Sequence, residues 1–344
     1  MSGGSPRGGA PESGAARGPA GGAPESGPAG GAAVSGSPGR GPAGGAAGSG
    51  YPGGGPAGGT APDGVCAIIL AAGEGTRLRP LTERVPKALC PIGNVPLLDR
   101  ALERVAALGF TGPERVAVNA CYLGDQVVRQ VGDRAHLSVE PGAPLGTSGG
   151  VANLRDWIDG RGVLVGNADS YLADPQAPPG PDIAALLAGW DGRTVRLLGQ
   201  PITDPTEPYG FDGHRFAGFS LLPWHYVRDL PVEPAELVKT VWRPAEAVGE
   251  LTVVPFAGTY LDTGTPADYL AANLHAAGGG NLVDPGATVD GRCRRAVIGA
   301  GAEVHGTVRD AVVWPGGTVA EDERLERAIR VGRDLTVTVG DPLA

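Results

Sequence analysis

The chain has 344 residues, a formal net charge of −9, and 60 glycines and 33 prolines. An acidic chain without a basic stripe interleaved with aromatic residues is not expected to bind nucleic acid. No apolar run approaches the ~20 residues that span a bilayer and no targeting segment is recognisable, so we expect no membrane contact and a cytoplasmic location.

Residues 1–63 are predicted to form a disordered tail. Glycine, alanine, proline and serine dominate them, and the tract Gly-Pro-Ala-Gly-Gly recurs without the triplet period of collagen. Such a segment cannot bury enough apolar surface to offset the entropy of ordering it. The rest of the chain suffices for one large domain and one small one, which we place at 64–277 and 281–339.

The segment 65–87 organises the large domain. Val65–Leu70 is apolar and β-branched, as in a strand buried on both faces, and Ala71-Ala72-Gly73-Glu74-Gly75 follows at once. A strand that feeds a glycine loop presents backbone N–H groups that favour an anion. Leu78 stands where the dinucleotide fingerprint needs its third glycine, and no Gly-Lys-Ser/Thr of a Walker loop is present, so both of those phosphate loops are excluded.

Lysine is rare in this chain. Only Lys87 and Lys239 are lysines, so the other 26 of the 28 basic residues are arginines. A lysine is a compact, flexible point charge that suits a moving phosphate, whereas arginine offers a rigid fork. We therefore single out Lys87 as a functional cation.

Strands and helices are predicted to alternate after the loop. Helices are expected at 96–108, 123–131, 151–157 and 266–276, and strands at 115–119, 136–140 and 163–166. This order predicts an α/β domain with a Rossmann-like, mostly parallel sheet and helices on both faces. Ligands of such sheets bind beyond the carboxyl ends of the strands, where the first glycine loop and a second glycine turn at 144–150 are both expected.

Two aspartates are candidate metal ligands. Asp169 follows the strand 163–166, where a carboxylate beside a phosphate loop is placed to hold Mg²⁺, although Asn-x-Asp after a strand is also a common turn. Asp262, 93 positions later, fits a turn or an N-cap near the helix at 266–276 by its spacing alone. Cys66, Cys90, Cys121 and Cys293 lack metal-binding or redox spacing and are expected to be buried free thiols.

The loop resembles the signature of a known enzyme family. Gly73-x-Gly75-Thr76-Arg77 followed by Pro86-Lys87 is similar to the signature of the sugar-1-phosphate nucleotidylyltransferases, and Tyr260-Leu261-Asp262-Thr263-Gly264-Thr265 resembles the end of their catalytic core. The resemblance implies transfer of a nucleoside monophosphate from a nucleoside triphosphate to a sugar-1-phosphate, with release of pyrophosphate. No general base is needed, because a phosphate monoester is largely dianionic at neutral pH, so the five histidines are expected to be structural or exposed.

The resemblance also implies residue roles. Arg77 and Lys87 would be the catalytic cations, and Asp169 and Asp262 would hold Mg²⁺. The triphosphate, base and ribose would contact Leu70, Ala71, Ala72, Gly73, Glu74, Gly75, Thr76, Gly146 and Thr147.

One part of the family pattern is missing. Relatives carry a Glu-Lys-Pro segment between the two aspartates whose lysine binds the sugar phosphate, but 199–222 contains no lysine. Arg215, Lys239 or Arg243 could supply the charge. Tyr209 and Gly210 resemble a Tyr-Gly pair that contacts the sugar in some relatives, so we expect a sugar-phosphate set of Tyr209, Gly210 and Arg215.

The C-terminal region shows pieces of a six-residue step of valines with glycine-rich turns between them. This pattern predicts a short parallel (left-handed) β-helix with about three turns of roughly eighteen residues, which in the family often builds oligomer contacts. We therefore expect a possible homo-oligomer.

Substrate choice rests on the resemblance. Pro144-Leu145-Gly146-Thr147 with a short tail looks closest to mannose-1-phosphate guanylyltransferases, which favours GTP and a product of the GDP-mannose type. Uridylyl transfer to an amino-sugar phosphate is the nearest competitor, followed by thymidylyl transfer to another sugar-1-phosphate. A catalytically inactive regulator that binds a nucleotide-sugar is the alternative of another class. The missing lysine favours the regulator, and the four intact charged residues oppose it.

Overall fold

The structure is a computed structural model that describes residues 62–203 and 210–340. All but the last two residues of the predicted tail, and Tyr209 of the expected sugar site, lie outside these ranges. Disorder of the tail therefore stays a prediction.

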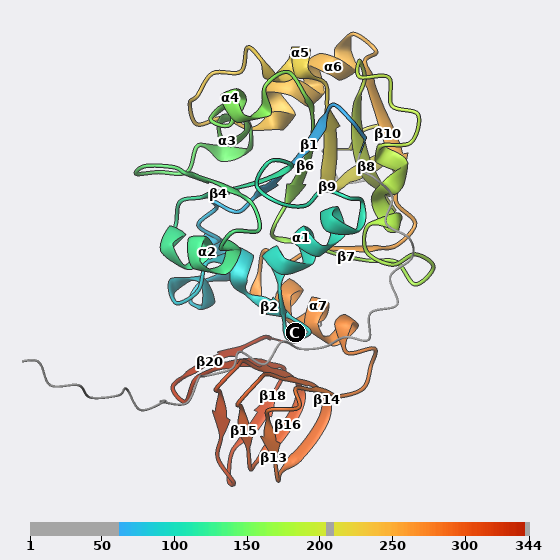
Figure 1. The fold of residues 1–344 in the computed structure, drawn as a ribbon. Helices are drawn as coiled ribbons and strands as arrows, with labels where there is room; N and C mark the ends of the chain where they lie inside the picture. Colours follow the sequence, from blue (N-terminus) through green and yellow to red (C-terminus); the bar gives the residue numbers. More distant parts are fainter. Residues whose placement is uncertain (1–61, 204–209, 341–344) are drawn as a thin grey trace, which may run out of the picture. The chain divides into compact units, whose positions relative to one another are not determined.

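A seven-stranded sheet forms the centre of the large domain (Figure 1). Its strands, in spatial order, are β10 (Leu251–Pro255), β8 (Val195–Pro201), β9 (His214–Leu222), β6 (Gly162–Asn167), β1 (Val65–Leu70), β4 (Val116–Ala120) and β5 (His136–Val139). β9 runs antiparallel to β6 and β8, and every other neighbouring pair is parallel. The sheet is therefore mixed, with β1 inside its parallel part.

Alternate residues of β1 face two separate cores. Ala67 and Ile69 pack in the core on one face, and Cys66 and Ile68 in the core on the other. One face is covered by α1 (Leu97–Ala107), α2 (Gly124–Val131) and the 3₁₀ segment Pro181–Leu186. The other is covered by α3 (Gly146–Ala152), α4 (Arg155–Ile158), α5 (Trp224–Val227), α6 (Arg243–Ala247) and the π-helical turn Val238–Trp242. A strand covered on both faces needs apolar residues at every position, as Val65–Leu70 provides.

The second glycine segment is helical, which differs from the expected turn at 144–150. Helix α3 begins at Gly146, and Gly149 and Gly150 lie inside it. A Cβ on Gly149 would stand 2.3 Å from the Glu233 carbonyl oxygen, and one on Gly150 would stand 2.7 Å from Asn119 Nδ2. Glycine is unfavourable inside a helix, but close packing leaves no room for a side chain at these two positions.

Several short elements and helix α7 lie outside the central sheet. These are 3₁₀ turns at Thr76–Leu78, Leu81–Glu83 and Lys87–Leu89, the hairpin of β2 (Pro91–Ile92) and β3 (Val95–Pro96), the antiparallel pair β7 (Ser170–Ala173) and β11 (Thr259–Asp262), and helix α7 (Pro266–Ala276). The N-cap of α7 is Thr265, whose hydroxyl accepts a hydrogen bond from the Asp268 N–H. Asp262 is therefore a strand residue, not the cap or turn residue that its spacing allowed.

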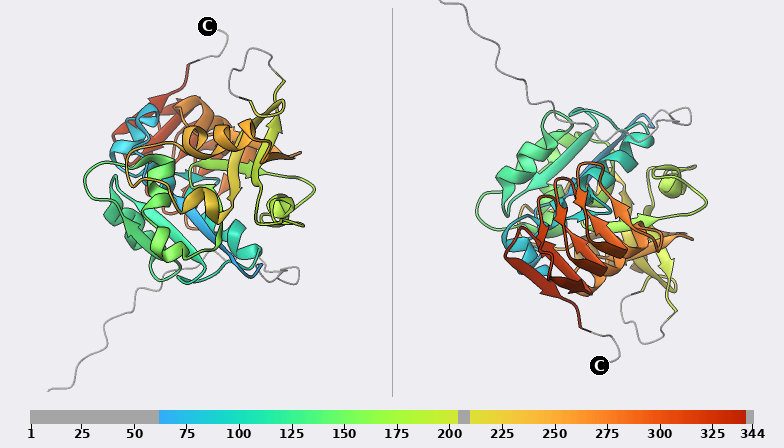
Figure 2. Two further views of the ribbon diagram at one scale, coloured as in Figure 1. Left: turned by 90° about the horizontal axis from the view of Figure 1, so that it is seen from above. Right: turned by 90° about the horizontal axis from the view of Figure 1, so that it is seen from below.

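The C-terminal region is a coil of short strands (Figures 1 and 2). They are β12 (Leu282–Val283), β13 (Thr288–Val289), β14 (Arg292–Ile298), β15 (Glu303–Val304), β16 (Thr307–Val313), β17 (Thr318–Val319), β18 (Arg324–Glu326), β19 (Ala328–Val331) and β20 (Leu335–Thr338). All pair in parallel except β19 with β20, which close the coil as an antiparallel hairpin.

The expected turn length of roughly eighteen residues is wrong. Leu282 pairs with Val297, fifteen positions later, and Val312 pairs with Ile329, seventeen positions later. Corners without side chains permit the shorter turn: a Cβ on Gly291 would stand 2.0 Å from the carbonyl oxygen of Gly306.

The coil shares a core with the segment that carries the signature. Leu78 and Leu81 belong to the same buried cluster as Tyr269 of α7 and Trp314 and Ile329 of the coil. The exposed ion pair between Arg84 Nη2 and Asp334 Oδ2, at 2.7 Å, lies at the edge of this contact. Residues of both domains therefore pack against the segment that carries Arg77 and Lys87.

Candidate active site

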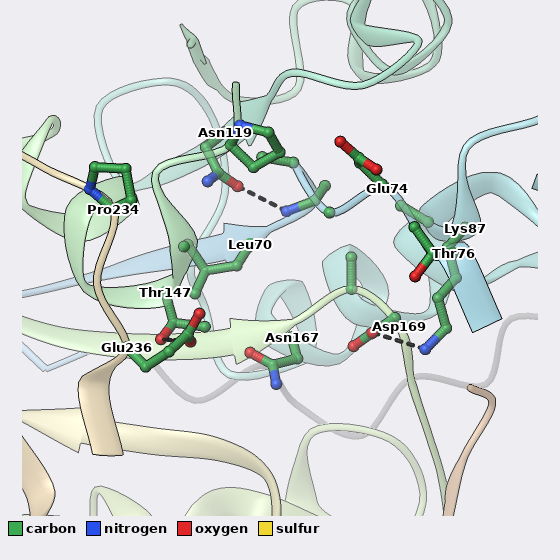
Figure 3. A pocket seen from close by; sticks show the side chains of 18 of the residues that line it. Leu70, Glu74, Thr76, Lys87, Asn119, Thr147, Asn167, Asp169, Pro234 and Glu236 are labelled. Carbon is green, nitrogen blue, oxygen red and sulfur yellow. Dashed lines mark hydrogen bonds and ion pairs between the residues drawn. The ribbon is translucent and has the colours of Figure 1, made fainter. Parts of the chain in front are cut away.

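A cleft of about 690 Å³ lies at the carboxyl ends of β1, β4 and β6 (Figure 3). It is lined by Leu70–Arg77, Lys87–Ala88, Asn119, Pro144, Gly146–Thr147, Asn167–Asp169, Pro234–Glu236, Lys239, Thr240 and Gly264. All nine residues of the expected nucleotide set line it, together with Arg77, Lys87 and Asp169. The predicted location beyond the strand ends is thus where the cleft is found.

The first glycine loop keeps open space above its backbone. A Cβ on Gly73 would meet no atom within 4 Å. Gly75 has a φ of +61° in the left-handed region, and its carbonyl accepts a 2.9 Å hydrogen bond from the buried hydroxyl of Thr82. A Cβ on Gly75 would stand 2.9 Å from Lys87 Cβ, so this glycine also lets the two ends of the signature meet.

Lys87 lies between the two candidate acids. Its ammonium Nζ is 2.8 Å from Asp169 Oδ2 and 3.5 Å from Asp262 Oδ1, and the residue is only 6% exposed. Both carboxylates therefore approach one point, although 93 positions separate them in the sequence. A buried ammonium is stable in this position because the two acids compensate its charge.

Strand pairing explains how Asp262 reaches Lys87, although Asp262 is not itself a lining residue of the cleft. In the β7–β11 pair, Asp262 lies opposite Ser170, the neighbour of Asp169. The Thr263 hydroxyl donates a 2.8 Å hydrogen bond to the Asp169 carbonyl and ties the same two segments again. Burial and the two nearby carboxylates also raise the pKa of Tyr260, which stays a neutral phenol.

Arg77 completes the charged group. Its Nη2 lies 3.3 Å from Asp262 Oδ2, and its side chain remains largely exposed. A Cβ on Gly264 would stand 2.8 Å from that same Nη2. Glycine in the Asp-Thr-Gly-Thr segment therefore makes room for the guanidinium.

The donor set fits a cation shared with phosphates. Asp169 and Asp262 are half-exposed acids, and both contact the Lys87 ammonium. No group of three or more His, Cys, Asp or Glu side chains within 62–203 and 210–340 is arranged to enclose an ion. Mg²⁺ commonly takes one or two carboxylates and completes its shell with water and substrate phosphates, so this pair suits it and a full protein cage is not required.

A buried polar pair links the two glycine segments. Asn119 Oδ1 accepts a 2.7 Å hydrogen bond from the Ala71 N–H, and Asn119 Nδ2 donates a 2.7 Å bond to Glu140 Oε1. Glu140 Oε2 accepts a 2.8 Å bond from the Leu145 N–H. Since both side chains are almost fully buried, these bonds fix the spacing of the loop after β1 and the start of α3.

The segment 233–240 forms one wall of the cleft, which we call the far wall. The Ser148 N–H donates to the Ala235 carbonyl at 2.9 Å, and the Thr240 hydroxyl donates to Ser148 Oγ at 2.8 Å. The Thr147 hydroxyl donates to Glu236 Oε2 at 2.7 Å and accepts from the Leu237 N–H at 2.8 Å. Figure 3 shows Thr147 and Glu236 on one side of Asn167, with Lys87 and Asp169 on the other.

Gly210 and Arg215 of the expected sugar-phosphate set do not line the cleft, and Tyr209 lies outside the described residues. Arg215 bonds Gln200 Oε1 and lies over the ring of Tyr260, 5.5 Å from its centroid. The Gly210 carbonyl accepts a bond from Arg243, which stacks on a phenylalanine ring. Of the three cations considered for the missing lysine, only Lys239 is a lining residue among the described part of the chain.

The cysteines and histidines take no part in the cleft lining. All four thiols are free, as predicted, but only Cys66 and Cys90 are buried, while Cys121 and Cys293 are partly exposed. Burial raises the pKa of Cys66 to about 11 and that of Cys90 to about 12. Both are therefore neutral at physiological pH.

Sequence reasoning missed Asn119, Glu140, Asn167 and the far wall. A signal existed for the first three, because each is a polar residue at the end of an apolar strand, where ligands of α/β sheets bind. The far wall gives no comparable signal, since its contacts come from a loop about ninety positions after the helix that it touches.

The chain is similar to known nucleotidyltransferases. A family model described as nucleotidyl transferase matches residues 66–178. The chain is 38% identical over 168 residues to an N-acetylmuramate alpha-1-phosphate uridylyltransferase of Neisseria meningitidis, covering 47% of this chain and 67% of that protein. It is 28% identical to the catalytic subunit beta of a mannose-1-phosphate guanylyltransferase of Danio rerio, covering 79% of this chain and 92% of that protein.

A solved structure gives the same fold. A putative glucose-1-phosphate thymidylyltransferase of Bacillus anthracis superposes with a TM-score of 0.52 at 20% identity, covering 62% of this chain and 95% of that one. The chain belongs to the nucleotidyl transferase family and is an enzyme of the sugar-1-phosphate nucleotidylyltransferase class. Within that class it is close to the mannose-1-phosphate guanylyltransferases, several of which match it along about four-fifths of its length. No helix in 62–203 or 210–340 is long and apolar enough to cross a membrane.

Proposed function

We propose that the enzyme transfers a guanylyl group from GTP to mannose-1-phosphate and releases pyrophosphate. The extent of the relatives' match carries this choice of substrates. Mannose-1-phosphate guanylyltransferases of Danio rerio and Neurospora crassa align with 79% and 80% of the chain, which requires the coil as well as the α/β domain, whereas that of Mycobacterium tuberculosis aligns with 36%. The uridylyltransferase relatives cover 47% and 61% of it.

The residues of the cleft have separate roles in this proposal. The N–H groups of Gly73–Thr76 and the Arg77 guanidinium hold the β- and γ-phosphates, a bidentate task that suits arginine. Lys87 neutralises charge that builds on the α-phosphate as the sugar phosphate oxygen attacks. Catalysis then consists of positioning and charge compensation, as in other phosphoryl-type transfers.

Asp169 and Asp262 would hold Mg²⁺. The ion supplies charge neutralisation of the phosphate oxygens when bound. Lys87 contacts both acids, so its ammonium would keep the two carboxylates close together for the ion.

The C-terminal coil belongs to the same proposal. Its parallel strands pair at a nearly constant offset, and a left-handed winding is what the family resemblance favours. We propose that it also contributes to contacts between copies of the chain. Sedimentation of the purified enzyme tests this, and a monomer at micromolar concentration would contradict it.

Uridylyl transfer is the second candidate. The observation in its favour is the 38% identity to the Neisseria N-acetylmuramate alpha-1-phosphate uridylyltransferase. Base selection would depend on a few hydrogen bonds at the cleft end near Leu70 and Gly146.

The deciding experiment is a matrix of pyrophosphate-release assays with Mg²⁺. Four nucleoside triphosphates are each combined with mannose-1-phosphate, N-acetylmuramate-1-phosphate, glucose-1-phosphate and N-acetylglucosamine-1-phosphate. We expect GTP with mannose-1-phosphate to give the highest kcat/KM. Higher values for a uridine or thymidine pair would transfer the assignment to that pair, and tight binding of a nucleotide-sugar without pyrophosphate release would favour the inactive regulator.

A further inference from the structure

One face of the C-terminal coil is rich in arginine. It is built from the first halves of β14 and β16 and from β18, which pair in parallel (Figure 1). Successive residues of a strand point to opposite sides, and here Cys293, Val308 and Leu325 pack in the core of the coil. The side chains on the outer side, which we call the arginine face, are those of Arg292, Arg294, Thr307, Arg309, Arg324 and Glu326.

The arginine face concentrates positive charge on an acidic chain. Its four arginines and one glutamate give a local charge of +3 (four minus one), whereas the whole chain has a formal net charge of −9. Neighbouring strands lie ~4.8 Å apart, so these charges are within one Debye length of each other at physiological ionic strength. Like charges on adjacent strands are unfavourable unless acids compensate them.

Two of the four arginines are compensated from within the face. Glu326 contacts Arg309, with 3.0 Å between Oε1 and Nη1, and Arg324, with 3.1 Å between Oε2 and Nη2. Asp310, at the adjoining corner, is engaged with Arg295 and Arg309. A single carboxylate thus bridges arginines of two neighbouring strands, which shows how this face receives an acid.

The other two arginines lack such an acid. Arg292 and Arg294 are exposed, and the side chain of neither forms a hydrogen bond or ion pair with the residues of 62–203 and 210–340. They are two positions apart on β14, which corresponds to ~7 Å along the strand. An extended peptide with an acid at every second position repeats its carboxylates at the same ~7 Å spacing. Each guanidinium can bind such a carboxylate through two parallel hydrogen bonds.

Other occupants fit the arginine face less well. Two copies of the chain stacked through it would bring like charges together, so the contacts proposed between copies require another part of the coil. Stable attachment to a membrane usually needs an inserted apolar group as well as basic residues, and binding of single-stranded nucleic acid needs aromatic side chains for stacking. None of the six outward side chains is aromatic or aliphatic.

We propose that the arginine face docks an extended acidic segment of a partner protein, whose alternate carboxylates bind Arg292 and Arg294. The proposal is independent of the substrates that the enzyme uses, since no residue of the face lines the cleft. Because the contacts are exposed ion pairs, binding is weak and falls as the salt concentration rises.

Fluorescence anisotropy with a labelled decapeptide of alternating glutamate and serine tests the proposal. We expect saturable binding of this peptide and none of the peptide in which glutamine replaces glutamate. The double variant Arg292→Gln/Arg294→Gln should weaken binding by about five- to thirtyfold, through the loss of two exposed ion pairs. It should fold normally, because neither side chain has a partner among the described residues.

The double variant Arg129→Gln/Arg193→Gln is the matched control. It removes the same total charge from two exposed arginines of the α/β domain whose side chains also lack partners within 62–203 and 210–340, so binding should change less than twofold. Glu326→Gln should instead tighten binding by about three- to tenfold, because it releases Arg309 and Arg324 for the peptide.

Equal losses in the two double variants would show that the peptide responds only to net charge and would overturn the proposal. Failure of the glutamate peptide to bind, or binding that the change at Arg292 and Arg294 leaves intact, would overturn it too. Vesicles of phosphatidylcholine with about 30% phosphatidylserine, and oligothymidylate, are titrated in parallel. If either of them binds more tightly than the peptide and loses its binding in the same variant, the face serves that ligand and the acidic-segment assignment is wrong.

Discussion

The loop after β1 and the start of α3 both bring glycines to the cleft, and the glycines serve different purposes. Above Gly73 there is empty space, so its backbone faces the ligand volume. A Cβ on Gly146 would stand 2.5 Å from the Ala235 carbonyl oxygen, and one on Gly149 would stand 2.3 Å from that of Glu233. The glycine of the first segment leaves space that a substrate can occupy. The glycines of the second segment leave space in which the far wall packs against α3.

The polar contacts of the two segments also differ, since those of the first lie around the candidate phosphate site and those of the second attach the far wall. At the first, cations and acids gather around Lys87. At the second, the Thr147 hydroxyl is already committed to Glu236 and Leu237. The comparison teaches that a glycine-rich motif at a ligand site can act indirectly, by letting another part of the protein close the site. Changes at the first segment should alter catalysis, and changes at the second should alter stability.

The largest effect is expected from Lys87→Ala. Removing the ammonium leaves two acids uncompensated and withdraws the charge that stabilises the transition state, so kcat should fall by ~10²–10³ in pyrophosphate-release assays. Arg79→Ala, which removes a cation of the same segment outside the cleft lining, is the control and should retain activity. Near-normal turnover of folded Lys87→Ala would remove the residue from its role.

Asp169→Asn should lower turnover by at least ~10²-fold while the protein stays folded, because the amide keeps the shape but loses the charge that a divalent cation needs. Turnover is measured across a Mg²⁺ titration. Asp174→Asn, beyond the other end of β7, serves as the control. A variant whose full activity and Mg²⁺ dependence match those of the unaltered enzyme would show that Asp169 holds no ion.

Gly149→Ala and Gly73→Ala form a pair that separates the two segments. The first places a methyl against the Glu233 carbonyl and should lower the free energy of unfolding by ~1–3 kcal/mol. The second meets no protein atom and should leave that free energy within ~0.5 kcal/mol while raising the KM for triphosphate. Urea unfolding and initial rates measure both. The reverse pattern would invalidate the division between the two glycine segments.

Thr147→Val tests the attachment of the far wall with the smallest expected change. Loss of the hydroxyl leaves the Leu237 N–H without its acceptor and should cost ~1 kcal/mol of unfolding free energy. Thr147→Ser keeps the hydroxyl and should restore stability. Equal stability of the valine and serine variants would show that these hydrogen bonds contribute nothing net.

Much of the α/β domain could be predicted because its signals are local. The apolar run Val65–Leu70 requires cover on both faces, and the strand borders follow the apolar runs. Asp169 could be placed from its position after β6. Asp262 could not, because its place depends on pairing of β11 with β7, and only the resemblance of its segment to a known one indicated a role.

Other features depend on distant contacts that no local pattern encodes. The first turn of α3 is stabilised by the Ala235 carbonyl of the far wall, which accepts a hydrogen bond from the Ser148 N–H, and glycine propensity alone does not reveal this contact. The placement of Arg215 beside Gln200 and Tyr260 likewise follows from sheet pairing. The coil was recognisable from its valine spacing, but the length of its turns depends on the close contacts at Gly291 and Gly306.

The shared core of Leu78, Leu81 and the coil residues Trp314 and Ile329 has a practical consequence for engineering. Grafting the C-terminal coil of a relative onto this enzyme would replace the coil residues that pack against its signature segment. Such a chimaera would need matching apolar contacts at the seam. Without these contacts, the signature segment would be poorly packed, and turnover would fall even though every residue of the cleft had been retained.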